Sequence, residues 1–314
     1  MNKQKKYIIL SKDAMCTDYL KCYSFGKECT PTPNIDELAE NGTVFTNYYA
    51  AGASTVMAFY SMCTGQYSFQ SNTQVYERKS KPYDGDTLFT KLKEIGYTQR
   101  HIIWSDGWET LPKFEDYFHN DVELHTINHL RSLVVGKNVS EDSNVDGQLA
   151  EQFLHKIEKI IVDILAKGER TFIWLHLPHV IAGRARYGSD MDLFDRYVGM
   201  VRKYFQDDEI TITADHGNMN GHRGKLAYAY DVYDPVVRIP FIRPRVGECT
   251  CARIMFLQLN SIILYSRIWF QRRILFIPKL LIRHKSTESL LYCIRVISIS
   301  IIRQIIPKNC MIWN

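Results

Sequence analysis

Three groups of polar residues directly follow or end short apolar runs, and they could supply metal ligands or catalytic groups. Asp13 comes just after the run YIILS, His176 ends the run TFIWLH, and Asp215-His216 follow the run ITITA. A carboxylate beside an imidazole suits a divalent cation such as zinc or manganese, and suits calcium less well. Asp13 is then the natural third ligand. Taken alone, the tripeptide Asp215-His216-Gly217 is also compatible with an ordinary surface turn.

Thr55 carries the candidate nucleophile, a hydroxyl group at the expected start of a helix. It follows the small residues Ala51-Gly52-Ala53-Ser54. In one interpretation Thr55 is an ordinary helix N-cap. In the other, the positive end of the helix orients the hydroxyl and a bound metal ion deprotonates it. The two roles are compatible with each other.

The elements that must position these groups alternate between strand and helix patterns. Apolar runs typical of strands lie at 7–11, 43–49, 101–104, 171–176, 210–214 and 237–242, and helical patterns lie at 32–39, 54–62, 86–95, 147–166 and 191–204. This alternation predicts an α/β fold with a mostly parallel central sheet and helices on both faces. Ligands bind such sheets beyond the carboxyl ends of the strands. We therefore expect Asp13, His176 and Asp215 to lie at one edge of the sheet.

Composition divides the chain near residue 246. The 314 residues are 46% hydrophobic and 23% charged, which is typical of a globular protein and excludes a disordered, collagen-like or disulfide-dense chain. The formal net charge of +5 is uneven, since residues 247–314 carry ten basic and two acidic residues whereas residues 1–246 carry 29 and 32. We expect no nucleic-acid partner for the domain at 1–246, because it has no basic excess.

Residues 247–314 form a basic, isoleucine-rich tail that differs in kind from the preceding domain. From Cys249 onward the sequence has no Asp and no Gly and contains 15 Ile. Few residues are therefore available to turn the chain. The tail is either a membrane-surface or partner-binding segment, or a disordered or out-of-frame C-terminus, and we favour the second interpretation.

The sequence also bears on compartment. The apolar part of the N-terminal segment MNKQKKYIIL is too short for a signal peptide, and the eight cysteines match no strong zinc pattern. No run reaches the roughly 18 uninterrupted apolar residues of a membrane-spanning helix. We expect a cytoplasmic protein with free thiols and no transmembrane segment, with peripheral membrane attachment as the alternative. The oligomeric state is not predicted.

Three further motifs carry a resemblance to a known family. The segment TPNIDELAENGTVFTNYY at 32–49 resembles the TPN(I/L)DxLAxxGxxFxNxY motif of the sulfatase-like branch of the alkaline phosphatase superfamily. TADHG at 213–217 with GHRGK at 221–225, followed by RIPFI at 238–242, is similar to the family's DHG…GxHxxxK…RxPxI block. The resemblance covers about residues 5–246. It implies an alkaline-phosphatase-like α/β fold and a sulfatase-like catalytic domain at 1–246, which is C-terminally incomplete if the tail is out of frame.

The resemblance also implies roles for individual residues. Asp13, Asp215 and His216 would bind one divalent metal ion (Mn, Zn or Ca). Thr55 lies ten residues before the Gly of a Thr-Gly pair, as the family's nucleophile does, and would be both the nucleophile and a fourth metal contact.

The resemblance assigns catalytic roles to three further residues. His222 and Lys225 would hold the non-bridging oxygens of the transferred group. His179 matches a family histidine near the leaving group, whereas the match of His176 is weaker. Considered without the resemblance, these two histidines are equally compatible with packing or supporting roles.

The departures from the family pattern concern the nucleophile. Sulfatases convert Cys or Ser of a C/S-x-P-x-R motif to formylglycine, whereas this chain has Thr55, Met57 and Phe59 there and Lys12-Asp13 in place of a tandem Asp. A threonine nucleophile resembles the phosphoethanolamine and phosphoglycerol transferases of the superfamily. We therefore expect an ester hydrolase or phospho-group transferase that acts on a phospho- or sulfo-ester through a covalent Thr55 intermediate. Its substrate would be saccharide- or lipid-linked, in surface-polysaccharide metabolism. The alternatives are a truncated inactive member or a non-catalytic binding module of the same fold.

Overall fold

The structure is a computed structural model. It describes residues 6–24, 29–68, 83, 85–104, 122–127, 143–178, 187–225, 228–229 and 231–244. The predicted tail at 247–314 and the candidate catalytic residue His179 lie outside the described residues. Within them, no helix is long and apolar enough to cross a membrane, and Cys16, Cys22, Cys29 and Cys63 are free thiols.

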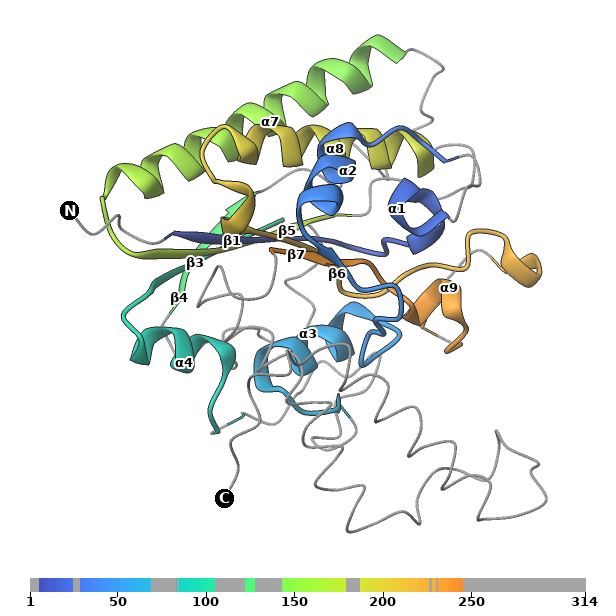
Figure 1. Cartoon of the computed structure of the whole chain (residues 1–314), viewed down its shortest axis with the longest axis horizontal. Helices are drawn as coiled ribbons and strands as arrows, with labels where there is room; N and C mark the ends of the chain where they lie inside the picture. Colours follow the sequence, from blue (N-terminus) through green and yellow to red (C-terminus); the bar gives the residue numbers. More distant parts are fainter. Residues whose placement is uncertain are drawn as a thin grey trace. The chain divides into compact units, whose positions relative to one another are not determined.

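The described strands form one seven-stranded sheet in the order β2-β7-β6-β1-β5-β3-β4 (Figure 1). Their bounds are β1 Tyr7–Lys12, β2 Thr43–Val44, β3 Thr98–Trp104, β4 Val122–Ile127, β5 Thr171–Leu177, β6 Ile210–Ala214 and β7 Phe241–Arg243. β1 pairs in parallel with β5 and β6, β3 pairs in parallel with β5 and β4, and β7 is antiparallel to both β6 and β2. The prediction of an α/β fold with a mostly parallel sheet is therefore confirmed.

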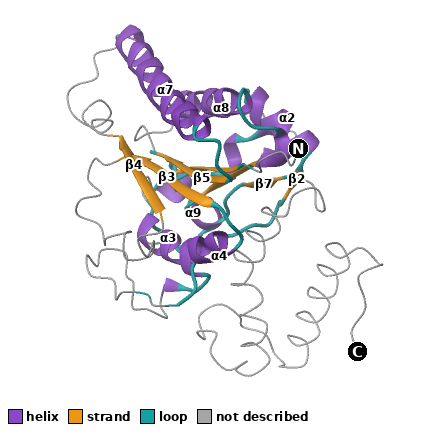
Figure 2. Ribbon diagram, turned by 90° about the vertical axis from the view of Figure 1, so that its left-hand side faces the viewer, coloured by secondary structure: helices purple, strands orange, loops and turns teal. Residues whose placement is uncertain are grey.

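Helices cover both faces of this sheet, as the alternation of patterns predicted. One face carries α1 Lys21–Ser24, α2 Pro33–Asn41, α7 Ser143–Ala166 and α8 Tyr187–Arg202, and the other carries α3 Thr55–Thr64 and α4 Leu88–Glu94 (Figures 1 and 2). The short helix α9 spans Asp234–Val237, and 3-10 turns lie at Thr17–Tyr19 (η1), Asp207–Glu209 (η4) and His222–Gly224 (η5).

Strand β1 shows how the two faces share the core. Ile8 and Leu10 pack into the hydrophobic cluster that contains residues of α2, α7 and α8. Tyr7 and Ile9 point the other way, into the cluster that contains residues of α3 and α4. All six residues of β1 are buried. This continuous burial, rather than alternation of apolar and polar residues, is typical of the central strand of a parallel sheet covered on both faces.

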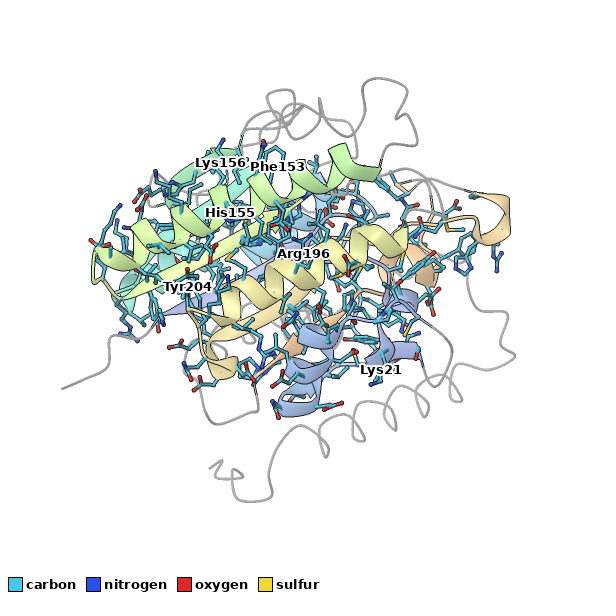
Figure 3. The ribbon with its side chains drawn as sticks, turned by 90° about the horizontal axis from the view of Figure 1, so that it is seen from above. Lys21, Phe153, His155, Lys156, Arg196 and Tyr204 are labelled. Carbon is cyan, nitrogen blue, oxygen red and sulfur yellow. The ribbon has the colours of Figure 1, made fainter. Side chains whose placement is uncertain are left out.

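Helices α7 and α8 lie side by side over one face of the sheet (Figure 3). Polar contacts join them at the surface: Arg196 of α8 pairs with Glu151, and the hydroxyl of Tyr204, two residues after α8, donates to Glu158 Oε1 at 2.9 Å. The apolar residues of α7 that these contacts flank, Ile157 and Ile161 among them, are fully buried against the sheet. Packing of this apolar stripe, more than the exposed pairs, therefore stabilises α7.

The start of α2 is capped by a carboxylate from a distant part of the chain. Asp195 of α8 accepts hydrogen bonds from the backbone N–H of Asn34 at 3.3 Å and of Ile35 at 2.9 Å. The side-chain amide of Asn34 donates to the same carboxylate at 2.8 Å. Thr32 makes no side-chain capping bond of its own. Asn34 therefore joins the start of α2 to α8.

Two predicted strands are shorter in the structure than the sequence indicated. The run at 43–49 is regular only at Thr43–Val44, after which Tyr49 forms an isolated bridge with Arg238. The run at 237–242 becomes a strand only from Phe241, because α9 ends at Val237 and Pro240 has no N–H to donate to a ladder. β4 was not predicted.

Candidate metal centre and nucleophile

Asp13, Asp215 and His216 come together at the carboxyl ends of β1 and β6, which are neighbouring strands. One ligand-type atom from each residue lies within 4.8 Å of the others, and all three side chains are buried. We call these residues the Asp-Asp-His cluster. The parallel pairing of β1 with β6 produces this arrangement, because it brings the residues that follow both strands to the same edge of the sheet.

Hydrogen bonds fix the protonation of the imidazole in this cluster. His216 Nδ1 lies 2.8 Å from the carbonyl oxygen of Gly217, which can only accept. Nδ1 therefore carries the hydrogen, and in the neutral ring Nε2 has a free lone pair. Nε2 lies 3.6 Å from Asp13 Oδ1 and 3.4 Å from Asp215 Oδ2. The ring is thus held in the form that can coordinate a metal ion through Nε2.

Backbone N–H groups hydrogen-bond to only one of the two carboxylate oxygens of Asp215. Its Oδ1 accepts hydrogen bonds from the N–H of Ala14 at 3.1 Å and of His216 at 2.7 Å. Its Oδ2 is buried and accepts no hydrogen bond from any described residue. A buried carboxylate oxygen without a donor is costly unless a cation compensates it. Two carboxylates and an imidazole form a donor set that fits a divalent cation.

The backbone is tightly constrained next to two of the candidate ligands, His216 and Asp13. Gly217 follows the ligands, and a Cβ there would lie 2.1 Å from the carbonyl oxygen of Pro235. The Gly217 N–H donates to the carbonyl of Val236 at 2.6 Å, so the loop after β6 packs directly on α9. Ala14, next to Asp13, has a left-handed φ of 56°. This conformation is strained for a residue other than glycine, and it turns the chain immediately after a candidate ligand.

Thr55 is the first residue of α3, and its Oγ1 lies 3.1 Å from His216 Nε2. Because Nε2 is an acceptor, the Thr55 hydroxyl is the donor in this contact. The N-cap position belongs to Ser54 and not to Thr55, so the interpretation of Thr55 as an ordinary cap does not hold. Thr55 thus joins the Asp-Asp-His cluster at a helix N-terminus, a position that favours negative charge.

Lys12 directly precedes Asp13 but does not join the cluster. Its ammonium group pairs with Asp190 of α8 at 2.5 Å, and both side chains are almost fully buried. Its Nζ also donates to the backbone carbonyl of Asp13 at 3.3 Å. The side chain therefore ties the end of β1 to α8 instead of supplying a ligand.

The structure does not place the other predicted catalytic residues against the cluster. The contacts described for His222 and Lys225 are with Asp18, at 3.1 Å from Nε2, and with Asp231. In the segment after β6, Lys225 is exposed and His222 is partly exposed. His179 lies outside the described residues, as stated above.

Tyr228 is a neighbour of the cluster that sequence reasoning missed. Its ring centroid lies 4.2 Å from that of the His216 ring, at an interplanar angle of 37°. Only its position three residues after Lys225 could have drawn attention to it. The ring covers one side of the imidazole and so restricts the orientations that His216 can adopt.

A cavity of about 260 Å³ lies along α3 and reaches Asp215. Its apolar lining includes Tyr48, Tyr67 and Met62, and its polar lining includes Ser61. The cavity therefore offers space, with aromatic walls, directly beside one of the cluster's carboxylates.

These features define a class. A mostly parallel sheet with helices on both faces, and with ligand-type side chains beyond its carboxyl edge, is the alkaline-phosphatase-like α/β fold, which the solved structures reported below share. The family model described as "Sulfatase" matches residues 5–243. The chain therefore belongs to the sulfatase family.

Relatives of known name agree with this assignment. An N-acetylgalactosamine-6-O-sulfatase of Bacteroides thetaiotaomicron is 36% identical over 101 residues, which are 31% of this chain and 19% of the relative. A solved 2-O GAG sulfatase has a TM-score of 0.53 at 14% identity, covering 78% of this chain and 65% of that one. The chain thus spans less than two thirds of both sulfatases. The C-terminal periplasmic domain of a phosphoethanolamine transferase from Campylobacter jejuni has a TM-score of 0.51 at 12% identity, covering 85% and 90%.

Proposed function

We propose that this protein is a metal-dependent ester hydrolase or group transferase that acts on a phospho- or sulfo-ester through a covalent intermediate on Thr55. The observation that carries the proposal is the 3.1 Å contact between Thr55 Oγ1 and His216 Nε2, within the Asp-Asp-His cluster. A hydroxyl, two carboxylates and a correctly protonated imidazole meet at one point. This is the arrangement required to activate a weak nucleophile.

Asp13, Asp215 and His216 would hold the metal ion, with Thr55 as a further contact. A bound divalent cation would lower the pKa of the Thr55 hydroxyl and polarise an ester oxygen. The partnerless Oδ2 of Asp215 and the acceptor state of His216 Nε2 support this assignment. The protein's own contribution is to fix these donors before the substrate binds.

The chemical steps then follow from the position of Thr55. Its oxygen attacks phosphorus or sulfur, and the bond from that atom to the leaving oxygen breaks. The N-terminus of α3 stabilises negative charge that develops on the transferred group. Water, or a hydroxyl group of an acceptor, attacks the Thr55 ester in the second step and restores the free hydroxyl.

We assign supporting roles to His222, Lys225 and His179. In the structure Asp18 and Asp231 pair with His222 and Lys225. Anionic oxygens of the substrate would exchange for these two carboxylates. His179 would give a proton to the leaving oxygen, as the family resemblance implies.

A phospho-ester is the preferred substrate in this proposal. Threonine cannot become formylglycine, and the arginine position of the formylglycine motif is occupied by Phe59. This ring is fully buried and stacks on Trp174 at 4.9 Å between centroids. The site therefore retains a hydroxyl nucleophile. A saccharide- or lipid-linked substrate is proposed by analogy with the named relatives, an N-acetylgalactosamine-6-O-sulfatase and a phosphoethanolamine transferase.

A paired assay tests the proposal. Wild-type protein, Thr55→Ala and Thr55→Ser are each incubated with an aryl phosphodiester and with an aryl sulfate, in the presence of Mn²⁺ or Zn²⁺. We expect turnover of the phosphodiester that is lost in Thr55→Ala and partly kept in Thr55→Ser. Turnover of the sulfate alone would contradict the preference for phosphorus. If folded, metal-loaded protein turns over neither substrate, an inactive or non-catalytic binding member of the family is favoured.

A further inference from the structure

Ser11, Trp174 and His176 form a buried hydrogen-bonded chain on the α3 side of the sheet. Ser11 and His176 are directly paired residues of the parallel strands β1 and β5. The Trp174 indole Nε1–H donates to Ser11 Oγ at 2.7 Å, and Ser11 Oγ lies 2.8 Å from His176 Nδ1. All three side chains are at most 1% exposed. Asp13, a member of the Asp-Asp-His cluster, lies two residues after Ser11.

The chemistry of the three groups fixes where the hydrogens lie. The indole N–H of Trp174 can only donate, so Ser11 Oγ accepts from it. The Ser11 hydroxyl hydrogen then needs an acceptor, because a buried donor without one is costly. Within the part of the chain that the structure describes, the Ser11 hydroxyl contacts only Trp174 Nε1 and His176 Nδ1. His176 Nδ1 is therefore the acceptor, and a neutral His176 carries its hydrogen on Nε2.

The surroundings of His176 keep the ring neutral and hold it near the cluster. Burial lowers the pKa of His176 to about 3. The negative charge of Asp13 raises this pKa, whereas His216 and Lys12 lower it further. The ring also meets Phe59 of α3 edge-on, at 4.7 Å between centroids. His176 is thus fixed by hydrogen bonding at Nδ1 and by packing, and its pKa responds to the negative charge of Asp13.

We propose that Trp174 and Ser11 are positioning residues that hold His176 as the Nε2–H tautomer, and that the polar N–H of this ring attracts the carboxylate of Asp13 and so orients it for cation binding. His176 would act through Asp13 and would not itself touch the substrate. The second half of the proposal depends on the function proposed above, whereas the first half does not.

The two buried histidines of this region would then serve opposite purposes. In His216 a carbonyl acceptor at Nδ1 leaves Nε2 free to coordinate. In His176 a hydroxyl donor at Nδ1 makes Nε2 a donor. Groups that hydrogen-bond a metal-binding residue typically change metal affinity by about 10- to 100-fold when removed. We expect an effect of this size from breaking the chain at Ser11.

Nitrogen NMR on histidine-labelled, metal-free protein tests the tautomer. The His176 signals are assigned from the spectrum of His176→Gln. At neutral pH we expect an unprotonated Nδ1 and a protonated Nε2 in the wild type, and a measurable population of the other tautomer in Ser11→Ala. Trp174→Phe keeps the ring but removes the N–H, and should act in the same direction. A protonated Nδ1 in the wild-type protein would overturn the proposal.

Calorimetric titration with Mn²⁺ tests the role in cation binding. The dissociation constant should rise about 10- to 100-fold in Ser11→Ala and recover in Ser11→Thr, which restores the hydroxyl. Ser24→Ala is the matched control, since Ser24 is also buried but donates to the carbonyl of Lys21. An unchanged dissociation constant in folded Ser11→Ala would overturn the second half of the proposal. Wild-type protein that binds no Mn²⁺ would overturn that half together with the proposed function, while the tautomer remains decided by NMR.

Discussion

The Thr55 hydroxyl lies 3.1 Å from the one ring nitrogen of His216 that can accept a hydrogen bond. Both side chains are buried, and they come from a helix start and a strand end that are 161 residues apart in sequence. The lone pair of His216 Nε2 that accepts the Thr55 hydrogen is the same lone pair that would coordinate a metal ion, so metal binding would displace this hydrogen bond. Metal binding and activation of Thr55 are therefore expected to occur together.

Replacing Asp215 by Asn should abolish metal binding without destabilising the metal-free fold. Ligand atoms of Asp13 and Asp215 lie within 4.8 Å of each other. Like charges at about 4 Å repel by roughly 1 to 4 kcal/mol, depending on the local dielectric. Asparagine keeps the Oδ1 acceptor for the N–H groups of Ala14 and His216. Differential scanning calorimetry should show an equal or higher melting temperature without metal, and no rise on adding Mn²⁺.

The wild-type protein should instead gain about 2.7 kcal/mol when free Mn²⁺ is a hundredfold above its dissociation constant. Asp208→Asn, at an exposed position, serves as the control and should keep the full metal-dependent rise. A metal-dependent rise that persists in Asp215→Asn would show that Asp215 is not a ligand.

Removing one charge of the buried Lys12–Asp190 pair should lower the free energy of unfolding far more than removing both charges. Their side chains are 2% and 1% exposed and lie 2.5 Å apart. Lys12→Met leaves Asp190 charged and buried, which typically costs about 3 to 5 kcal/mol. The double replacement Lys12→Met with Asp190→Leu should recover most of this loss. Urea unfolding measures the free energy of unfolding of the single and the double variant. An equal decrease in the two variants would contradict the prediction.

Tyr228 should tune metal affinity through its ring and not through its hydroxyl. Its ring lies 4.2 Å from that of His216. Contacts of this kind contribute about 0.5 to 1.5 kcal/mol, which corresponds to roughly a 2- to 12-fold change in a binding constant. Tyr228→Ala should weaken Mn²⁺ binding by that factor in a calorimetric titration. Tyr228→Phe is the matched control and should bind as the wild type does, so equal losses in both variants would point to the hydroxyl instead.

His101 should make the fold sensitive to mild acid. It is fully buried, and burial lowers its pKa to about 3, with the charge of His176 adding to the effect. An unfolded histidine has a pKa of about 6.5, so only the unfolded state takes up this proton as the pH falls below 6.5. The stability that depends on a neutral His101 is complete above pH 6.5 and is lost progressively toward pH 3. At pH 5 the loss is about 2 kcal/mol.

Urea unfolding at pH 7, 6 and 5 tests this effect with two variants. In His101→Phe the aromatic ring can still stack on Trp174, whose ring centroid lies 5.1 Å from that of His101. Its stability should therefore fall less steeply with acid than that of the wild type. His155→Gln removes an exposed histidine and should leave the slope unchanged. Parallel curves for wild type and His101→Phe would contradict the assignment.

The central strands of the sheet could be predicted from local sequence patterns. Unbroken apolar runs identified β1, β5 and β6, because strands buried on both faces contain few polar residues. The polar residues just beyond β1 and β6 could be expected to meet, since parallel strands end at the same edge of a sheet. Asp13 and Asp215 therefore came together as predicted. β4 was missed because only the first four residues of VELHTI alternate apolar and polar, which is too short a pattern to identify a strand.

Contacts that depend on strand register or on loop conformation were not predictable. Ser11 and His176 pair only because β1 and β5 align at that register, which no local pattern specifies. Tyr228 packs on His216, and no local pattern around either residue indicates this contact. Likewise, nothing local to His222 indicates that Asp18 is its partner. Motif spacing predicts which residue types are present, but not which partner each one meets.

Helix α8 has two carboxylates that each hold a different segment of the chain. Asp190 binds Lys12 at the end of β1, and Asp195 binds the first N–H groups of α2. A shift of α8 relative to the sheet would have to break an ion pair one residue away from Asp13. Helix α8 therefore constrains the end of β1, and with it Asp13 of the Asp-Asp-His cluster, although no residue of the cluster lies on α8.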